Sequence, residues 1–359
     1  MKNLYQEKNL FFKELKSEVN EFLIENKISV QRSESNILIA IFLFVLWAIF
    51  FFLYLTQGQN HMAWAFIFSG LWALVMLPIQ MSVMHDASHG ASSPHSFVNK
   101  VLSLSISFLG GSAILWKKQH CYAHHSFTNI HNMDHDIDTG QVLRLHYSQP
   151  LKRYHKWQHY YAWALYPLFV LSWIWWGDFR DIMFNTYSMS KTQIRFAIFE
   201  TLLIKVWHVT LFLVIPSYML NSFWLAISCY LFSFSILGLV MVVVFQLAHI
   251  SDKQLLPESL KELGNDWAVR QVLTTANFAT NNLFLTWFIG GLNFQIEHHI
   301  FPHMSHINYP RIHSIVKARC QHEGLQYQSF PTLISAIKGH QRHLIRLGNF
   351  SELSTALRK

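Results

Sequence analysis

Long runs of apolar residues alternate with polar segments along this chain of 359 residues. Residues 37–55 form a run of 19 without a charged side chain, and as an α-helix such a run extends about 28 Å, enough to cross the hydrocarbon core of a bilayer. Four runs of this kind predict transmembrane helices, at about residues 37–55, 62–84, 196–220 and 223–248. The pattern therefore predicts an all-α integral membrane protein.

The polar residues between and within these runs refine the prediction. Short loops at residues 56–61 and 221–222 predict that the four helices form two hairpins. The third run is less uniform than the others because it contains Lys205 and His208. We expect these two side chains either to face the helix bundle or to extend toward the membrane surface.

Two further apolar stretches are poorer candidates for spans. Residues 101–116 are few and are interrupted by Gly110 and Gly111, and residues 157–176 contain Pro167 and many Trp and Tyr. Aromatic rings favour the headgroup region of a bilayer. We therefore interpret both stretches as interfacial or re-entrant helices; the alternative is that one of them spans.

The distribution of charge orients the chain. Lys and Arg are concentrated in residues 1–32, 100–195 and 251–359 and are absent from both short loops, so the positive-inside rule assigns these three regions to the cytoplasm. We divide the chain into a cytoplasmic N-terminal segment, a membrane domain and a cytoplasmic tail, at residues 1–35, 36–325 and 326–359.

The composition supports a membrane protein and excludes several other classes. Only 13% of the residues are charged, against about 25% in soluble proteins, and 52% are apolar. Disorder and a disulfide scaffold are excluded, the latter because the three Cys are far apart and odd in number. The net charge of +8 follows the cytoplasmic segments, which indicates contact with anionic lipid headgroups rather than with nucleic acid.

Histidine is unusually abundant, with 22 residues, and many of these lie in three clusters. The clusters contain His85 and His89, then His120, His124 and His125, and finally Gln295, His298 and His299. Residues four apart share one face of an α-helix, so the two histidines of the first cluster should point the same way. In the second cluster, His125 is turned by about 100° from His124, which lets one helix offer ligands to two neighbouring metal positions.

With four spans, all three clusters emerge on the cytoplasmic side, where they can meet at one centre. A site rich in imidazole suits iron, zinc or copper. His249 ends the fourth run at the same level, and a polar ring at a membrane boundary needs a partner, so we add it to the candidate ligands. Gln295 lies one helical turn before His298 and His299 and should face the same site.

Several acidic residues neighbour the clusters, and metal-bound histidines usually donate their second ring N–H to a carboxylate. These residues are Asp86, Asp134, Asp136, Asp138 and Glu297. The run from Asp134 to Asp138 could equally be a solvated loop, so both interpretations stay open at this point.

The three clusters together resemble the histidine boxes of membrane fatty acid desaturases, H-x-x-x-H, H-x-x-x-H-H and Q-x-x-H-H. The flanking residues match as well, in segments 84–90, 116–129 and 291–302, and the resemblance extends from about residue 36 to residue 325. One H-x-x-x-H alone is a weak signal, whereas three boxes together are specific. Gln295, in place of the His found in stearoyl-CoA desaturases, is a feature of front-end and related acyl-lipid or acyl-CoA desaturases.

The resemblance implies a fold and a chemistry. The fold is a set of four spans with a cytoplasmic helical cap that holds two irons, and the chemistry uses O2 and electrons from a separate carrier to insert a double bond into an acyl chain. The implied iron ligands are His85, His89, His120, His124, His125, His298 and His299, and the resemblance also supports His249. Gln295 would bind the metal weakly or contact a bound water or a neighbouring ligand.

Two departures from related families bear on the site and on the electron donor. In stearoyl-CoA desaturases an Asn contacts iron through a water molecule, and this chain has Phe245 at the corresponding position. The neighbouring Gln246 could take over that contact. The chain contains no His-Pro-Gly-Gly motif of a fused haem domain, so we expect a ferredoxin or a small cytochrome as donor in trans. Five basic residues could steer an acidic carrier to the site. The alternative is that they are the ordinary positive charge of a cytoplasmic segment. They are Lys117, Lys118, Lys152, Arg153 and Lys156.

Other functions fit the same boxes. A related di-iron hydroxylase of lipid, sterol, alkane or carotenoid would use the same ligands and differ in its product. A metal-binding membrane transporter or sensor would carry polar residues at mid-membrane in several spans, whereas the first and fourth runs contain few. The residues leave open the double-bond position, the acyl carrier (CoA, glycerolipid or sphingoid base) and the oligomeric state. We expect the inner membrane of a bacterium or the endoplasmic reticulum of a eukaryote.

Overall fold

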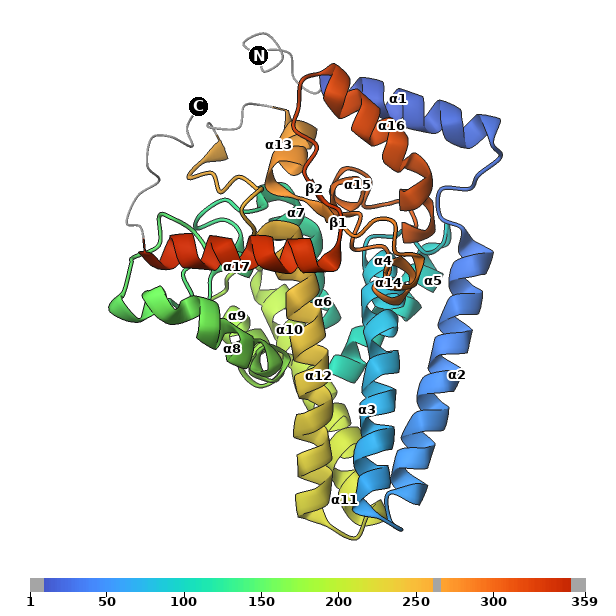
Figure 1. Ribbon diagram of the computed structural model, residues 1–359. Coiled ribbons are helices and arrows are strands. Elements are labelled where there is room, and N and C mark those ends of the chain that lie inside the picture. The colour runs from blue at the N-terminus through green and yellow to red at the C-terminus, as the bar shows by residue number, and fades with distance from the viewer. Residues whose placement is uncertain (1–9, 261–265, 350–359) are drawn as a thin grey trace. The chain divides into compact units, whose positions relative to one another are not determined.

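The computed structural model describes residues 10–260 and 266–349, and the chain divides into two compact units. The spanning unit contains Ser33–Gln119 and Leu165–Val242, and the histidine-rich unit contains the described parts of 1–32, 120–164 and 243–359. Both units are built almost entirely from helices, as predicted (Figure 1).

The spanning unit contains long helices joined by short ones. In chain order these are α2 (Ser33–Gln57), α3 (Met62–Pro78), η1 (Ile79–Met84), α4 (His85–Ser88), α5 (Ser96–Ser103), η2 (Leu104–Leu109), α6 (Ala113–Trp116), η6 (Trp173–Gly177), α9 (Asp178–Met183), α10 (Lys191–Val209), η7 (Thr210–Val214), α11 (Ile215–Met219) and the first part of α12 (Phe223–His249). Helices α2 and α3 run side by side (Figure 1).

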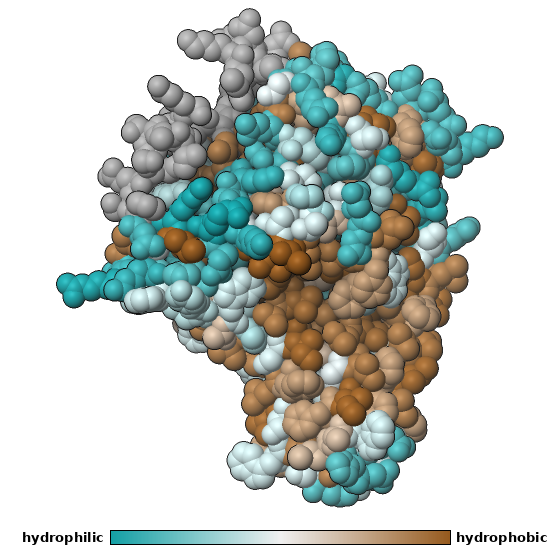
Figure 2. Space-filling view, viewed as in Figure 1, coloured by the Kyte–Doolittle hydropathy of each residue, from teal (hydrophilic) through white to brown (hydrophobic). Residues whose placement is uncertain are grey.

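Four continuous helical segments are long and apolar enough to cross a membrane, and they agree with the four predicted spans. They are Ser33–Gln57, Met62–Ser88, Lys191–Met219 and Phe223–His249. Apolar side chains such as those of Leu38, Phe42 and Phe52 are exposed on α2, and Figure 2 shows an apolar surface over the long helices. Such a surface is typical of a membrane protein.

The apolar stretch after α4 is bent. The helical pieces Ser96–Leu109 and Ala113–Phe127 meet at 109°, the geometry of a re-entrant loop or of a broken span. Gly110 makes this turn with φ of 82°, which is strained for any other residue, and a Cβ on Gly111 would lie 2.4 Å from the ring of Trp173. Close packing of this turn therefore requires both glycines.

A polar network holds the same turn inside the spanning unit. Lys205 Nζ donates to the carbonyl of Gly110 at 2.5 Å and to Asp178 Oδ2 at 3.1 Å. The backbone N–H of Ser112 donates to the same Asp178 oxygen at 3.2 Å, and the Ser112 hydroxyl donates to Glu200. Of the two interpretations left open for Lys205, the structure supports the one in which it faces the bundle interior.

The histidine-rich unit combines three separated stretches of chain. Its elements are α1 (Leu10–Glu25), η3 (Lys117–His124), α7 (His125–Phe127), η4 (His135–Ile137), η5 (Arg153–Trp157), α8 (Gln158–Ser172), the end of α12, α13 (Trp267–Thr274), β1 (Asn277–Phe278), α14 (Leu283–Phe288), α15 (Gln295–Ile300), η9 (His306–Asn308), α16 (Tyr309–His322), β2 (Ser329–Phe330) and α17 (Leu333–Asn349). The two short strands pair in parallel, with Asn277 opposite Ser329.

Helix α1 closes one side of this unit by packing on α13 and α16. Its buried face repeats every three to four residues, which is the period of an amphipathic helix. Phe12 meets Trp267 of α13 edge to face at 5.6 Å between ring centroids. Arg319 of α16 forms ion pairs with Glu14, at 2.9 Å, and with Glu18.

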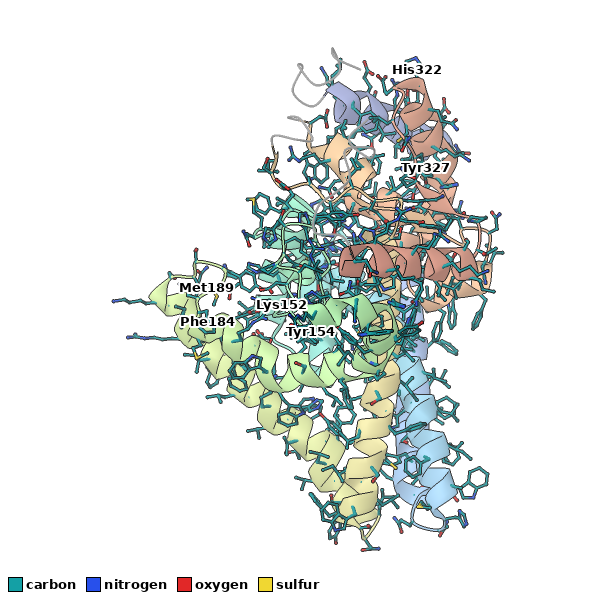
Figure 3. The ribbon with its side chains drawn as sticks, turned by 60° about the vertical axis from the view of Figure 1, so that its left-hand side comes forward. Lys152, Tyr154, Phe184, Met189, His322 and Tyr327 are labelled. Atoms are coloured by element: carbon teal, nitrogen blue, oxygen red, sulfur yellow. The ribbon has the colours of Figure 1, made fainter. Side chains whose placement is uncertain are left out.

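Helix α17 is held by two buried polar side chains, one in the loop after η4 and one at the start of α8. Arg144, only 1% exposed, donates to the carbonyls of Leu347 and Gln149, both at 2.7 Å. Gln158 Nε2 donates to the carbonyl of Leu344 at 2.9 Å. The bond to Leu347 satisfies a carbonyl in the last turn of α17, which lacks a partner within the helix. Lys152, just before η5, is exposed, and Figure 3 labels it beside Tyr154.

Candidate metal centre

Six of the predicted ligand histidines gather inside the histidine-rich unit. They come from η3 and α7, from the last residue of α12 and from α15: His120, His124, His125, His249, His298 and His299. Every one of them is buried. Burying so many imidazoles together is costly unless they share partners, which points to a ligand among them.

One group of three histidines is His124, His249 and His299. A ring nitrogen of each lies within 4.8 Å of a ring nitrogen of the others. The ring centroids are 4.6 Å apart for His124 and His249 and 4.9 Å apart for His249 and His299. One metal ion could be held by such a triplet after small side-chain movements.

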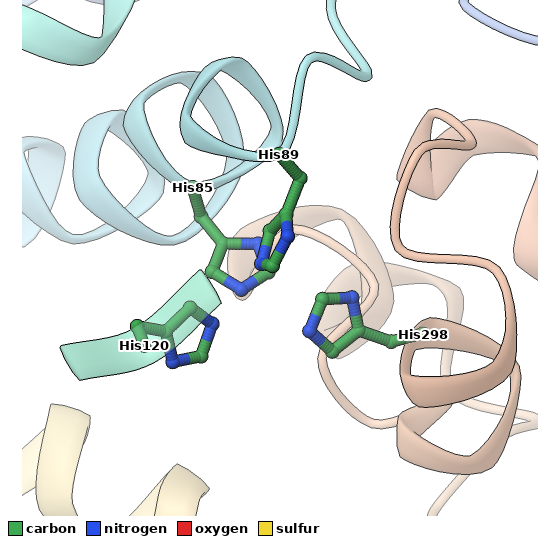
Figure 4. Close-up of side chains that lie close together, drawn as sticks. All are labelled: His85, His89, His120 and His298. Atoms are coloured by element: carbon green, nitrogen blue, oxygen red, sulfur yellow. The ribbon is translucent and has the colours of Figure 1, made fainter. Parts of the chain in front are cut away.

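A second group of three shares one member with the first. His125, His298 and His299 have ring nitrogens within 4.8 Å of one another, and the rings of His125 and His299 are nearly stacked at 4.3 Å. His120 lies next to this group, with its ring 5.0 Å from that of His125 and parallel to that of His298 (Figure 4). Two adjacent groups suit a centre with two metal ions.

The winding of η3 explains why His120 lies close to both of the following histidines of its cluster. Residues Lys117–His124 form a π-helix, in which bonds close between residues five apart. His120 is consequently close both to His124, at 5.5 Å between ring centroids, and to His125, at 5.0 Å. The segment is thus a π-helix and not the α-helix that we assumed, but His120 and His124 do lie together, and the rings of His124 and His125 are inclined at 85° and belong to different groups of three.

The first cluster forms a pair within the spanning unit. Helix α4 directly follows the π-helix η1; His85 is its first residue, and His89 comes directly after its last residue. The two rings are 4.9 Å apart and both side chains are buried (Figure 4). The predicted common face of these two residues is confirmed.

A buried carboxylate orients His124. Asp134 Oδ2 lies 3.1 Å from His124 Nδ1, and Asp136 Oδ2 lies 3.2 Å from the same nitrogen. Burial lowers the pKa of His124, but the two carboxylates outweigh it and raise the pKa to about 9. Of the two interpretations of the acidic run, Asp134 fits the carboxylate partner, whereas Asp138 is exposed. A metal ion bound at Nε2 would displace the proton from that atom.

Asn129, which ends the second box, ties three elements together. Its backbone N–H donates to Asp134 at 2.8 Å, and its side-chain amide donates to the carbonyls of His249 and Thr274 at 2.8 and 3.0 Å. Its φ of 61° lies in the left-handed region, which Asn tolerates better than most residues. Asn129 is the last residue of the segment that flanks the second box, and these bonds give it a structural role.

The third box is anchored by residues that sequence reasoning missed. Glu297, one of the carboxylates expected beside the cluster histidines, instead accepts from Asn277 Nδ2 at 2.7 Å and from the hydroxyl of Tyr327, and its Oε1 lies 3.3 Å from His313 Nδ1. The hydroxyl of Tyr309 lies 3.2 Å from His298 Nδ1. These partners lie outside the boxes, so only a pattern of polar residues in otherwise apolar segments could have suggested them.

Gln295 contacts a candidate ligand instead of the solvent. Its Nε2 lies 3.3 Å from His249 Nε2, and the side chain is 1% exposed. Among the described residues, Gln295 Oε1 and His299 Nε2 are buried atoms without a hydrogen-bond partner. Burial, followed by the neighbouring imidazoles, lowers the pKa of His299 well below 6.5, so this ring is neutral. A neutral imidazole with a free nitrogen is a metal ligand, so the residues fit a transition metal.

Comparisons with known proteins show the family of the chain. The family model described as fatty acid desaturase matches residues 61–331. An sn-1 linoleoyl-lipid 6-desaturase of Synechocystis sp. is 29% identical over 97% of this chain and 98% of the relative, and one of Arthrospira platensis is 30% identical over 94% and 92%. An acyl-lipid (8-3)-desaturase of Physcomitrium patens is 32% identical over 94% of this chain and 72% of the relative. The chain is therefore an oxidoreductase that belongs to the fatty acid desaturase family.

Proposed function

We propose that this protein is an acyl-lipid desaturase, which inserts a double bond into a fatty acyl chain carried by a membrane lipid. The observation that carries the proposal is the pair of buried three-histidine groups that share His299. The relatives that align over nearly the whole chain are named as desaturases of acyl groups in lipids. The four apolar helices would place the enzyme where such a substrate is dissolved.

Two irons bound by these imidazoles would supply the oxidising power to remove hydrogen from an unactivated methylene, which acid–base side chains lack. Per turnover, two hydrogens from the acyl chain, two electrons and two protons reduce one O2 to two waters. We assign His124, His249 and His299 to one ion and His125 and His298 to the other.

The remaining box residues complete the proposed ligand set. His120 would join the second ion, because its ring lies beside those of His125 and His298. His85 and His89 are proposed as further ligands, because each imidazole is buried and the two rings are adjacent. Gln295 would hydrogen-bond a water at the metal or hold His249 in place, because an amide is a weaker ligand than imidazole.

The proposed topology is four spans in two hairpins, with the histidine-rich residues forming a cytoplasmic helical cap. The connections between α2 and α3 and between α11 and α12 contain no Lys or Arg, which supports their placement on the far side of the membrane. The membrane is the inner membrane in a bacterium or the endoplasmic reticulum in a eukaryote.

A ferredoxin or a small cytochrome is proposed as the electron donor. Lys152, Arg153 and Lys156 are exposed around η5 and give the histidine-rich unit a basic segment. Basic side chains increase the rate at which an acidic carrier arrives. Replacing all three with Gln should lower turnover at limiting carrier and leave it unchanged at saturating carrier.

Product analysis tests the function directly. The chain is expressed in a host with few unsaturated lipids, defined fatty acids are fed, and new double bonds are located by mass spectrometry. The proposal predicts a new alkene in the lipid fraction, and none in a host carrying His299→Ala. A hydroxylated product would instead support a di-iron hydroxylase, and unchanged lipids in the presence of bound iron and a donor would contradict the proposal.

A pair of variants separates ligands from neighbouring residues. We expect His299→Ala to lose most of the bound iron, because it removes a direct ligand of one ion from the place where the two groups meet. Gln295→Ala should keep more iron and still lose most activity. Iron content and product yield are measured side by side for both variants. Equal loss of iron would make Gln295 a true ligand, and normal turnover of Gln295→Ala would make it a bystander.

A further inference from the structure

The buried amide of Gln271 lies between the backbone of the second box and the side chain of the third. Gln271 belongs to α13, outside all three boxes, and is 1% exposed. Its Oε1 lies 2.7 Å from His299 Nδ1, and its Nε2 donates to the carbonyl of His125 at 3.1 Å. Trp267, one turn earlier on α13, donates to the same carbonyl at 3.0 Å.

The direction of these hydrogen bonds follows from the backbone. The carbonyl of His125 can only accept, so the NH2 group of Gln271 must face it and the amide oxygen must face His299. The Thr128 hydroxyl lies within donating distance of two acceptors, the carbonyl of His124 at 2.8 Å and Gln271 Oε1 at 3.0 Å. Whichever of them receives its proton, its oxygen can accept from the same His299 nitrogen at 3.3 Å. Both neighbours of Nδ1 are thus acceptors, and the ring proton lies on Nδ1.

A proton on Nδ1 leaves Nε2 of the neutral ring as the nitrogen with a lone pair. Nε2 is also the buried nitrogen without a hydrogen-bond partner among the described residues. We infer that Gln271 is a positioning residue that fixes the tautomer and orientation of His299, so that Nε2 of the histidine shared by both groups binds metal. The inference rests on the proposed function.

Partners of this kind contribute strongly to metal affinity, and their loss typically weakens binding by 10- to 100-fold. Gln271→Met keeps the length of the side chain but can neither accept from His299 nor donate to the second box. Gln271→Glu keeps an acceptor for Nδ1–H. Thr128→Val removes the longer of the two bonds to His299, together with the hydroxyl's contacts to the carbonyl of His124 and to Gln271, but it keeps the 2.7 Å bond from His299 to Gln271. Its effect on Co²⁺ affinity should therefore be smaller than that of Gln271→Met.

The test uses Co²⁺ as probe, because Co²⁺ reports its ligands through d–d absorption. Metal-free full-length protein in detergent is titrated with Co²⁺. Gln271→Met should bind about 10- to 100-fold more weakly than the wild type, with a changed spectrum. Gln271→Glu should restore affinity to within a few-fold. The matched control is Gln158→Met, which removes an equally buried glutamine that bonds Arg144 and α17.

The outcomes are distinguishable. If Gln158→Met lowers the thermal midpoint but keeps the wild-type Co²⁺ affinity and spectrum, while Gln271→Met changes both, the inference holds. If Gln271→Met binds Co²⁺ like the wild type, or if both glutamine variants weaken binding equally, Gln271 has only a structural role. Failure of the wild type to bind Co²⁺, with no new alkene in the product assay, would instead overturn the proposed function.

Discussion

The ion pair of Lys205 and Asp178 allows a quantitative test of how the spanning unit is stabilised. The two side chains are 9% and 2% exposed, and their charged atoms are 3.1 Å apart. At an effective dielectric constant of about 20, unit charges at this distance attract by about 5 kcal/mol. Removing both from water costs a similar amount, so the pair adds little net stability, whereas one charge left alone is unfavourable. Lys205→Met or Asp178→Asn should each lower the free energy of unfolding by about 3–5 kcal/mol.

Thermal unfolding of the detergent-solubilised protein measures this effect. At roughly 2–4 °C per kcal/mol, each single variant should unfold about 6–20 °C below the wild type. The double variant Lys205→Met/Asp178→Asn leaves no buried charge, so its loss should be well below the sum of the two single losses. Lys191→Met, at the exposed start of the same helix, is the matched control and should change the midpoint little.

Two results would refute this reasoning. If the losses of the single variants add up in the double variant, the two charges do not interact. If Lys205→Met unfolds at the wild-type temperature, the ammonium group reaches water, and the turn at Gly110 is held by something else.

Three further predictions concern stability. Burial lowers the pKa of His146 and His340 to about 4, below the value near 6.5 that holds in the unfolded chain. The unfolded state therefore binds more protons as the pH falls, and each group should lower the free energy of unfolding by about 1 kcal/mol between pH 6.5 and 5.5. A thermal midpoint of the metal-free protein that does not fall over this range would contradict it. Arg144→Met leaves buried carbonyls unsatisfied, among them that of Leu347 in α17, and should lower the free energy of unfolding by about 2–4 kcal/mol, with faster tryptic cleavage in α17. Unchanged cleavage would show that α17 docks without Arg144. Gly111→Ala should lower the free energy of unfolding by about 1–3 kcal/mol, because its Cβ would meet the Trp173 ring. A thermal midpoint equal to that of the wild type would mean that the ring moves freely.

The membrane helices were predictable because an apolar run long enough to cross a bilayer is a local property of the sequence. The role of Lys205 was not, because its partner Asp178 lies 27 residues earlier in the chain. A charge inside an apolar run indicates that a partner exists but does not identify it. Only tertiary packing decides between a buried pair and a side chain that reaches the surface.

The histidine clusters were predictable from their spacing, but the way they face one another was not. The π-helical winding of η3 brings His120 and His125 together, and nothing in the residue types distinguishes that winding from an α-helix. The residues that orient the histidines, such as Gln271 and Tyr309, belong to other elements and carry no motif. Spacing therefore identifies candidate ligands, and the packing of distant segments determines their geometry.

The assembly of the histidine-rich unit from three stretches of chain has a consequence for biosynthesis. Helix α1 is made first, but its partners α13 and α16 belong to the last third of the chain. At 5–20 residues per second, roughly 10–35 s separate the synthesis of His125 from that of His299. During that interval neither group of three histidines exists, so a metal that arrives early meets an incomplete set of ligands. With the proposed ligand set, metal loading would therefore follow translation, and the metal available to the finished chain would matter more than the metal available to the nascent one.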